Sequence, residues 1–219
     1  MSIKTVIAAG VFAVAATSAG ATSITVDFEG PGFFGTNNWY KTVSANGRRV
    51  YAGNIRVKDV STGVGFGVFC IELAQYITNG STYEIAGKSM YGAAVDSNIS
   101  KLFSSAYDMV VDATSAAAFQ VALWEITHEE AGNPLDAQSG NFVVTGPGAV
   151  IRTADAFLAG LAGASDDFAV TYLRSDTKQD QVLPTDPDHT PPPAPVPLPA
   201  AGWMLLAALG GLGLARRKS

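Results

Sequence analysis

Apolar and polar positions follow different periods in the two halves of the chain. From Ser23 to about Ala86, β-branched and aromatic residues alternate with polar ones or form short apolar runs between clusters of Gly, Asn and Ser. Such runs are typical of strands. We expect strands at 24–28 and 66–73, the second nearly all apolar as in a buried strand, and a hairpin formed by 49–51 and 55–57.

The second half has the period of helices. The first predicted helix follows Ser97, a good capping residue, and its apolar stripe comprises Ile99, Leu102, Phe103, Ala106 and Val110. A second helix is predicted from Thr114 or Ser115 to His128, ahead of a glycine and a proline. A third carries Val150, Ile151, Ala154, Phe157, Leu158 and Leu161, and strand-like runs flank it at 142–144 and 168–173.

The N-terminal end has the three parts of a secretory signal peptide. Lys4 supplies the positive charge, 6–16 is the apolar stretch, and Ala19-Gly20-Ala21 is a small-x-small cleavage site. Residues 1–21 are therefore expected to be removed, and the mature chain is expected to begin at Thr22.

A change in composition marks the other end of the domain. Eight of the 11 prolines lie between Pro184 and Pro199, a density that cannot form a packed core. We expect an extended spacer at 184–195. Residues 22–183 remain, enough for one domain with a core of its own. Its elements predict the α+β class, with a β-sandwich or barrel-like part and a small helical part packed against it.

The last 24 residues combine a proline-spaced motif, an apolar stretch and a basic end. The stretch, 201–215, is short for a bilayer span, and the cations after it are expected to stay on the cytoplasmic side. An ordinary single-span anchor is one interpretation. The segment 196–219 also closely resembles the PEP-CTERM sorting signals of Gram-negative bacteria in their Val-Pro-Leu-Pro-Ala variant. The residues that carry this resemblance are Val196, Pro197, Leu198, Pro199, Ala200, Arg216 and Arg217.

That resemblance implies export, transient anchoring in the inner membrane by the C-terminus, and processing by an exosortase-like enzyme. The final location is then the cell surface or the extracellular space.

Charge and composition exclude several classes of binding partner and cofactor. The chain has a net charge of −5, and removal of both ends takes away four cations and leaves about −9. An acidic surface repels phosphate backbones, so we expect no nucleic-acid partner. The sequence has no glycine-rich phosphate loop, and with one cysteine and one histidine in the domain it has no zinc constellation. We therefore expect no cofactor and no metal.

The single cysteine is the main candidate for chemistry. Cys70 has no partner for an internal disulfide in an exported chain. It is either a small buried apolar residue or a reactive group.

Two segments together resemble the halves of a thioester domain, a family of bacterial surface adhesins. One is an aromatic-Cys-Ile-acidic run around Cys70, and the other is a Gln-x-Ala-x-Trp motif formed by Gln120, Ala122 and Trp124. In that family the cysteine forms an internal thioester with the glutamine. The residue before the glutamine is commonly threonine, whereas here it is Phe119.

The resemblance implies a covalent binder of amine-bearing targets that acts once and is not a turning-over enzyme. A thiolate displaces ammonia from the Gln120 carboxamide, and a target amine later displaces the sulfur. Formation needs close positioning and a reactive thiol. Trp124, one helical turn after Gln120, would cover the bond or simply pack in the core. Glu72 and Glu125 would orient an ammonium group or be solvated, and solvation is the expectation.

Two other functions remain open. Cys70, His128 and Asn133 occur in the order familiar from papain-like enzymes, so a cysteine peptidase or amidase is one alternative. A passive surface or matrix module with a free buried Cys70 is the other.

Overall fold

The computed structural model describes residues 22–30, 32–36 and 38–185. The expected signal peptide, most of the proline-rich spacer and the whole of the expected sorting signal lie outside this part. Within it, no helix has both the length and the apolar character needed to cross a bilayer.

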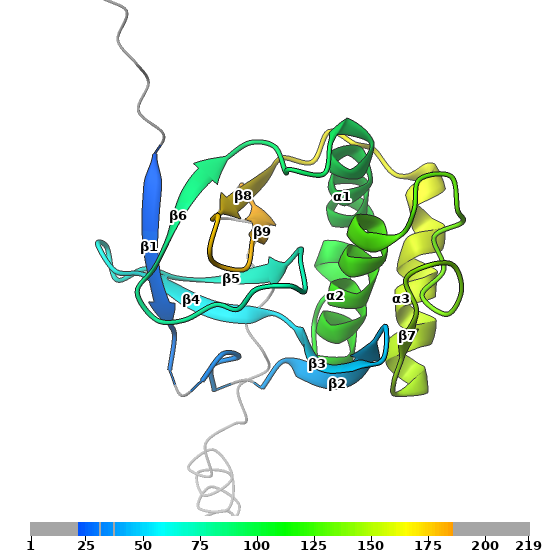
Figure 1. Cartoon of the computed structure of the whole chain (residues 1–219), viewed down its shortest axis with the longest axis horizontal. Helices are drawn as coiled ribbons and strands as arrows, with labels where there is room; N and C mark the ends of the chain where they lie inside the picture. Colours follow the sequence, from blue (N-terminus) through cyan, green and yellow to red (C-terminus); the bar gives the residue numbers. More distant parts are fainter. Residues whose placement is uncertain (1–21, 31, 37, 186–219) are drawn as a thin grey trace, which may run out of the picture.

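Six antiparallel strands close into a barrel, seen on the left of Figure 1. Every neighbouring pair is antiparallel, and β1 closes the barrel by pairing with both β4 and β6. In barrel order the strands are β1 (Ser23–Phe28), β4 (Ile55–Asp59), β5 (Gly65–Cys70), β9 (Gln181–Pro184), β8 (Val170–Arg174) and β6 (Ser81–Ala86).

A second sheet has the order β3-β2-β7 and lies against the helices (Figure 1). It consists of β2 (Tyr40–Ala45), β3 (Arg48–Gly53) and β7 (Val144–Thr145). Asn46 and Gly47 join β2 to β3 with φ angles of 44° and 79°. Positive φ at both central residues is the requirement of the tight hairpin turn that suits the twist of the strands.

The expected hairpin between 49–51 and 55–57 is wrong. The first segment belongs to β3 and pairs with β2, whereas the second belongs to β4 and pairs with β1 and β5. Only Asn54 separates β3 from β4, and one residue is too few to reverse the chain. The chain therefore passes directly from one sheet into the other.

In the described part of the chain, three helices pack beside the two sheets. They are α1 (Ala93–Ala106), α2 (Ala113–His128) and α3 (Gly148–Gly160), with short 3₁₀ turns at 107–109 and 161–163. The central helix α2 is buried all round from Ser115 to Thr127, because it contacts α1, α3 and strands of both sheets. Its alanines allow these close approaches.

The predicted helices exist, with one corrected start. The first begins at Ala93, after Gly92 with its φ of 95°. Ser97 is therefore inside the helix and is not its cap, and its hydroxyl donates to Asp166. The flanking strands are shorter or shifted, since β7 covers only 144–145 and β8 covers 170–174. The α+β class with a barrel and a packed helical part is confirmed.

An N-terminal cap stabilises the start of α2. The Asp112 carboxylate accepts hydrogen bonds from the backbone N–H groups of Thr114 and Ser115, at 2.9 and 2.7 Å. We predict that Asp112→Ala lowers the free energy of unfolding by about 1 kcal/mol, because these donors lose their partner. Urea denaturation measures the change. Asp108→Ala, which removes an exposed carboxylate nearby, is the matched control, and an equal loss in both variants would contradict the assignment.

Candidate functional site

Cys70 is the last residue of β5, and its main chain faces away from its strand partner. Cys70 lies opposite Gln181 of β9, and the bond of this ladder runs from the Ile71 N–H to the Asp180 carbonyl, at 3.1 Å. In an antiparallel ladder, the N–H and C=O of such a non-hydrogen-bonded residue point to the opposite side. The peptide groups of Cys70 therefore need a partner from elsewhere.

The neighbouring strand does not supply that partner. Pairing between β4 and β5 stops at Ile55 opposite Val68. One residue earlier, the Asn54 N–H already donates to the Trp39 carbonyl beside the second sheet, at 3.1 Å. The place next to Cys70 is consequently left open on this side.

The side chain of Gln120, from the middle of α2, fills that place. Its Oε1 accepts from the Cys70 N–H at 3.0 Å, and its Nε2 donates to the Cys70 carbonyl at 2.6 Å. Gln120 is 1% exposed and Cys70 is 5% exposed. The two residues singled out by the sequence, 50 positions apart, are thus in direct contact through a carboxamide and a peptide backbone.

The residues just before this pair hold α2 against β5. The rings of Phe69 and Phe119 lie 4.7 Å apart, and both are fully buried. Phe119 stands where the motif that this segment resembles commonly has threonine, and here the position carries a packed ring. Aromatic contacts of this kind contribute about 1 kcal/mol beyond the area they bury.

The sulfur of Cys70 has a different partner, which the sequence did not indicate. Sγ donates to Oε1 of Gln179 at 2.9 Å, and Nε2 of Gln179 donates to the Glu72 carbonyl at 2.8 Å. Gln179 lies in the turn before β9, more than 100 residues along the chain, and belongs to no motif. Only the closure of the barrel by β9 brings it to Cys70.

The thiol is neutral in this environment. Burial raises the pKa of Cys70 to about 12, a rise that the Gln181 side chain opposes and the negative charge of Glu72 reinforces. Burial therefore opposes the reactive thiolate that thioester formation would need. Any chemistry at Cys70 has to begin from the protonated thiol.

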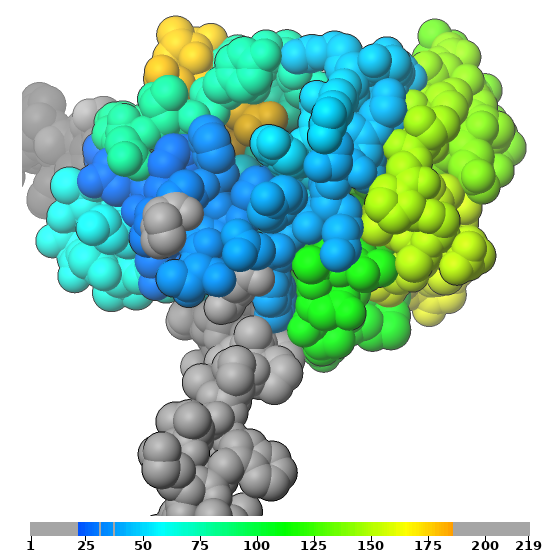
Figure 2. All heavy atoms as spheres, turned by 90° about the horizontal axis from the view of Figure 1, so that it is seen from below, coloured from blue at the N-terminus to red at the C-terminus, as the bar shows by residue number. Residues whose placement is uncertain are grey.

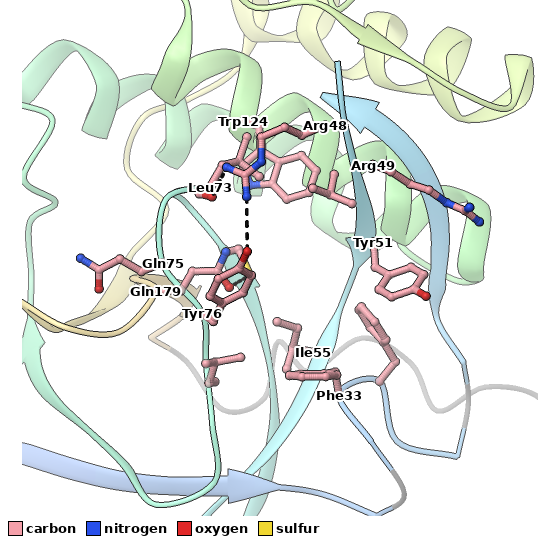
Figure 3. A pocket seen from close by; sticks show the side chains of 14 residues that line it. Phe33, Arg48, Arg49, Tyr51, Ile55, Leu73, Gln75, Tyr76, Trp124 and Gln179 are labelled. Atoms are coloured by element: carbon pink, nitrogen blue, oxygen red, sulfur yellow. Dashed lines mark hydrogen bonds between the residues drawn. The ribbon is translucent and has the colours of Figure 1, made fainter. Parts of the chain in front are cut away.

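A pocket of about 350 Å³ has Cys70 in its lining. Figure 3 shows this pocket from close by, with side chains such as Arg48 and Trp124 around it. Trp124 and Gln179 line it together with aromatic and aliphatic side chains, and Arg48 crosses it, donating to the Leu73 carbonyl at 3.1 Å and contacting the Tyr76 hydroxyl at 3.5 Å. Figure 2 shows the face on which blue and cyan segments of the N-terminal half lie beside the yellow-green helical part. Tyr76 in the pocket lining is exposed, so the pocket opens to the surface.

Trp124 lies one turn after Gln120 on α2 and lines the pocket beside Cys70. Its side chain is 1% exposed, and its Nε1 has no hydrogen-bond partner among the described residues. The indole therefore shields the inner end of the pocket from solvent and leaves one donor free.

His128 and Asn133 are engaged elsewhere. Nδ1 of His128 lies 3.0 Å from the Trp124 carbonyl, the ring stacks on Phe142, and burial lowers the histidine pKa. The Asn133 amide donates to Glu129. None of these contacts involves Cys70, so within the described residues no imidazole contact supports the peptidase alternative.

The two glutamates next to the motifs were expected to be solvated, but neither is fully exposed. Glu125 is fully buried, and its Oε1 accepts from the Asp136 N–H at 3.0 Å. Burial raises its pKa to about 7. Glu72 is half-buried, and burial together with the Asp180 carboxylate raises its pKa. Glu125 is buried and is absent from the lining of the pocket that contains Cys70, so neither an amine-orienting role nor a solvated role describes it.

The part of the chain that the structure describes contains no group of three or more His, Cys, Asp or Glu side chains placed to hold a metal ion. No protein-family model, curated protein or solved structure matches the chain.

Glu125 makes stability depend on pH. Its pKa is about 7 in the folded chain and 4.5 when exposed, so between these values the folded state keeps a proton that the unfolded state releases. The contribution of Glu125 to stability is therefore highest below pH 4.5 and falls as the pH rises through 7. We predict that Glu125→Gln removes this loss, so that the variant gains on the order of 2 kcal/mol relative to the original chain between pH 5 and pH 8.

Urea denaturation at the two pH values measures this difference. Glu130→Gln changes an exposed glutamate on the same segment and is the control. A pH-independent difference between Glu125→Gln and the original chain would show that Glu125 does not titrate in this window.

Proposed function

We propose that this chain is an exported thioester protein, in which Cys70 and Gln120 form an internal thioester that attaches the protein covalently to amine-bearing targets. The observation that carries the proposal is the pair of hydrogen bonds between the Gln120 carboxamide and the Cys70 main chain, at 3.0 and 2.6 Å. They hold the electrophile beside the residue that bears the nucleophile, at the inner end of a pocket.

The first step is an exchange of amide for thioester. Sγ of Cys70 attacks Cδ of Gln120, the Cδ–Nε2 bond breaks, and the thiol proton leaves with the nitrogen as ammonia. Atoms balance without any other reactant. Glutamine suits this step because its nitrogen, once protonated, leaves as neutral ammonia, whereas glutamate would have to expel hydroxide.

The backbone N–H of Cys70 is oriented to stabilise the transition state of this first step. This N–H already donates to Oε1 of Gln120, the oxygen on which negative charge develops as the sulfur adds. A fixed donor at a developing oxyanion in a dry site is an effective form of transition-state stabilisation. The unpaired Nε1–H of Trp124 is a further buried donor lining the same pocket.

Close positioning of the reacting groups has to compensate for the low reactivity of the protonated Cys70 thiol. Because the pKa of Cys70 is raised to about 12, the thiolate is scarce at neutral pH, and the sulfur must leave Gln179 before it attacks. Close placement of the reacting groups lowers such a barrier by several kcal/mol. We expect slow, spontaneous formation after folding, followed by long survival in a site from which water is excluded.

In the second step a target amine enters the pocket and attacks Cδ. The C–S bond breaks, an amide forms with the Gln120 side chain, and the thiol of Cys70 is regenerated. Each molecule reacts once, which is the behaviour of a covalent binder.

The cellular setting of the proposal comes from the two ends of the sequence. A signal peptide at 1–21 and a sorting signal at 196–219 would deliver the domain to the cell surface or beyond, after processing by an exosortase-like membrane enzyme. Adhesion or attachment to extracellular matrix is the corresponding purpose.

A passive surface module is the second candidate, and one observation favours it. The Gln120 carboxamide satisfies both open peptide groups of Cys70, which is a sufficient structural reason for a buried glutamine. In that case Cys70 is an inert buried thiol, as its raised pKa would also suit.

Intact mass separates these candidates. We predict that the purified protein is lighter than its calculated mass by one ammonia, and that methylamine adds to it. Cys70→Ala and Gln120→Ala are each expected to restore the calculated mass and abolish uptake, because each removes one end of the bond. If the original chain had its full calculated mass, the thioester would be ruled out and the passive module would be the remaining candidate.

Gln179→Ala is the matched control, since it removes the other carboxamide that contacts Cys70. It is expected to keep both the mass deficit and methylamine uptake. If Gln179→Ala lost the deficit while Gln120→Ala kept it, the bond would join Cys70 to Gln179 and the assigned pair would be wrong.

A further inference from the structure

The mouth of the Cys70 pocket gathers the exposed aromatic rings of the domain. Among the described residues, the large aromatic side chains that are exposed are Phe33 (46%), Tyr51 (59%) and Tyr76 (72%), and all three line this pocket (Figure 3). Exposed aromatic groups that converge on one opening are typical of a binding site.

Two of these rings, Phe33 and Tyr51, are held by contacts with other rings of the domain. Phe33 packs edge-on against Phe28 at 4.5 Å, and Tyr51 packs edge-on against Tyr40 at 5.1 Å. A rim that is already ordered loses little conformational entropy on binding.

The pocket is also positively charged in an acidic protein. Arg48 and Arg49 line it, whereas no Asp or Glu does. In the described part of the chain the recorded ion pair is between Arg56 and Glu29, so neither of these two arginines is neutralised in that way. Against a net charge of −5 for the whole chain, this is a local site for anions.

The two arginines bear on which amine can enter. A lysine among neutral or basic neighbours would be repelled by two guanidinium groups, whereas carboxylates beside the lysine would pair with them. Close cations also favour the uncharged form of an amine, which is the form that attacks a carbonyl.

The depth of the reacting atoms favours a peptide over an amino sugar. Cys70 and Gln120 are almost fully buried beneath the rim, so the nucleophile needs a narrow stem. Lysine carries its amine on a flexible four-carbon chain, and the apolar walls of the pocket, such as Ile55 and Leu73, suit that chain.

We propose that the pocket selects a lysine flanked by acidic residues in a target protein, with Arg48 and Arg49 binding the flanking carboxylates and the aromatic rim covering the lysine stem. This inference rests on the proposed thioester for its covalent step, but not for the charge preference of binding.

The purified protein is incubated with acetylated, amidated Asp-Lys-Asp, Ala-Lys-Ala and Arg-Lys-Arg peptides, with glucosamine, and with methylamine as the reference. Each uptake rate, followed by intact mass, is divided by the methylamine rate of the same protein. We expect the acidic peptide to react roughly tenfold faster than the basic one at low salt, with a smaller ratio at high salt. Equal rates, or fastest uptake of glucosamine, would overturn the proposal.

Arg49→Glu is the variant of choice, because Arg48 also supports the Leu73 carbonyl. It is expected to remove or reverse the preference for the acidic peptide. Arg152→Glu makes the same charge change at an exposed position on α3 and is expected to keep the preference. Loss of preference in both variants would attribute it to overall charge rather than to the pocket.

Binding of fluorescent peptides to Gln120→Ala separates the two proposals, since this variant cannot form the thioester. Preferential binding of the acidic peptide without methylamine uptake by the original chain would refute the thioester alone. Methylamine uptake by the original chain without any acidic preference in either assay would refute the charge selection alone.

Discussion

The arrangement of the site depends on the need to pair the buried peptide groups of Cys70. Strand β9 pairs with only one side of β5 at this point. On the other side, β4 begins only at Ile55, opposite Val68, because the chain before it belongs to the second sheet. An N–H and a C=O left unpaired in the interior would each be costly. The Gln120 carboxamide has one acceptor and one donor at the right separation, so a single side chain from α2 replaces a strand.

That replacement links the barrel to the helical part and to the chemistry. Because α2 is buried all round, its position is set by many contacts, among them the Phe69–Phe119 ring pair beside the site. The same burial has two opposite effects on reactivity. It excludes water from a thioester, yet it also raises the pKa of the thiol that must form it. Positioning, and not thiolate population, is then what would make the reaction possible.

The surface around the site is different in character from the rest of the domain. Acidic groups predominate in the chain, but the pocket mouth combines fixed aromatic rings with two arginines. These residues come from the segment around Phe33, from β3 and from the loop after β5. A substrate preference built from such separate segments requires the crossover from β3 to β4, which the hydrophobic pattern did not reveal.

The sequence by itself determined what depends on local pattern, namely the α+β class and the existence of the three helices in the described part of the chain. Cys70 and Gln120 were singled out by the resemblance of their two segments to a known pair of motifs. The hydrophobic period is local, so it can be read along the chain, whereas the predicted cap Ser97 proved to lie inside α1. Only the tertiary structure decided the partners that lie far apart, including Gln179 at the sulfur, the arginines at the pocket, the separation of β3 from β4 and the burial of Glu125. These depend on which strand edges and helix faces meet, and nothing in a single segment specifies its neighbour in space.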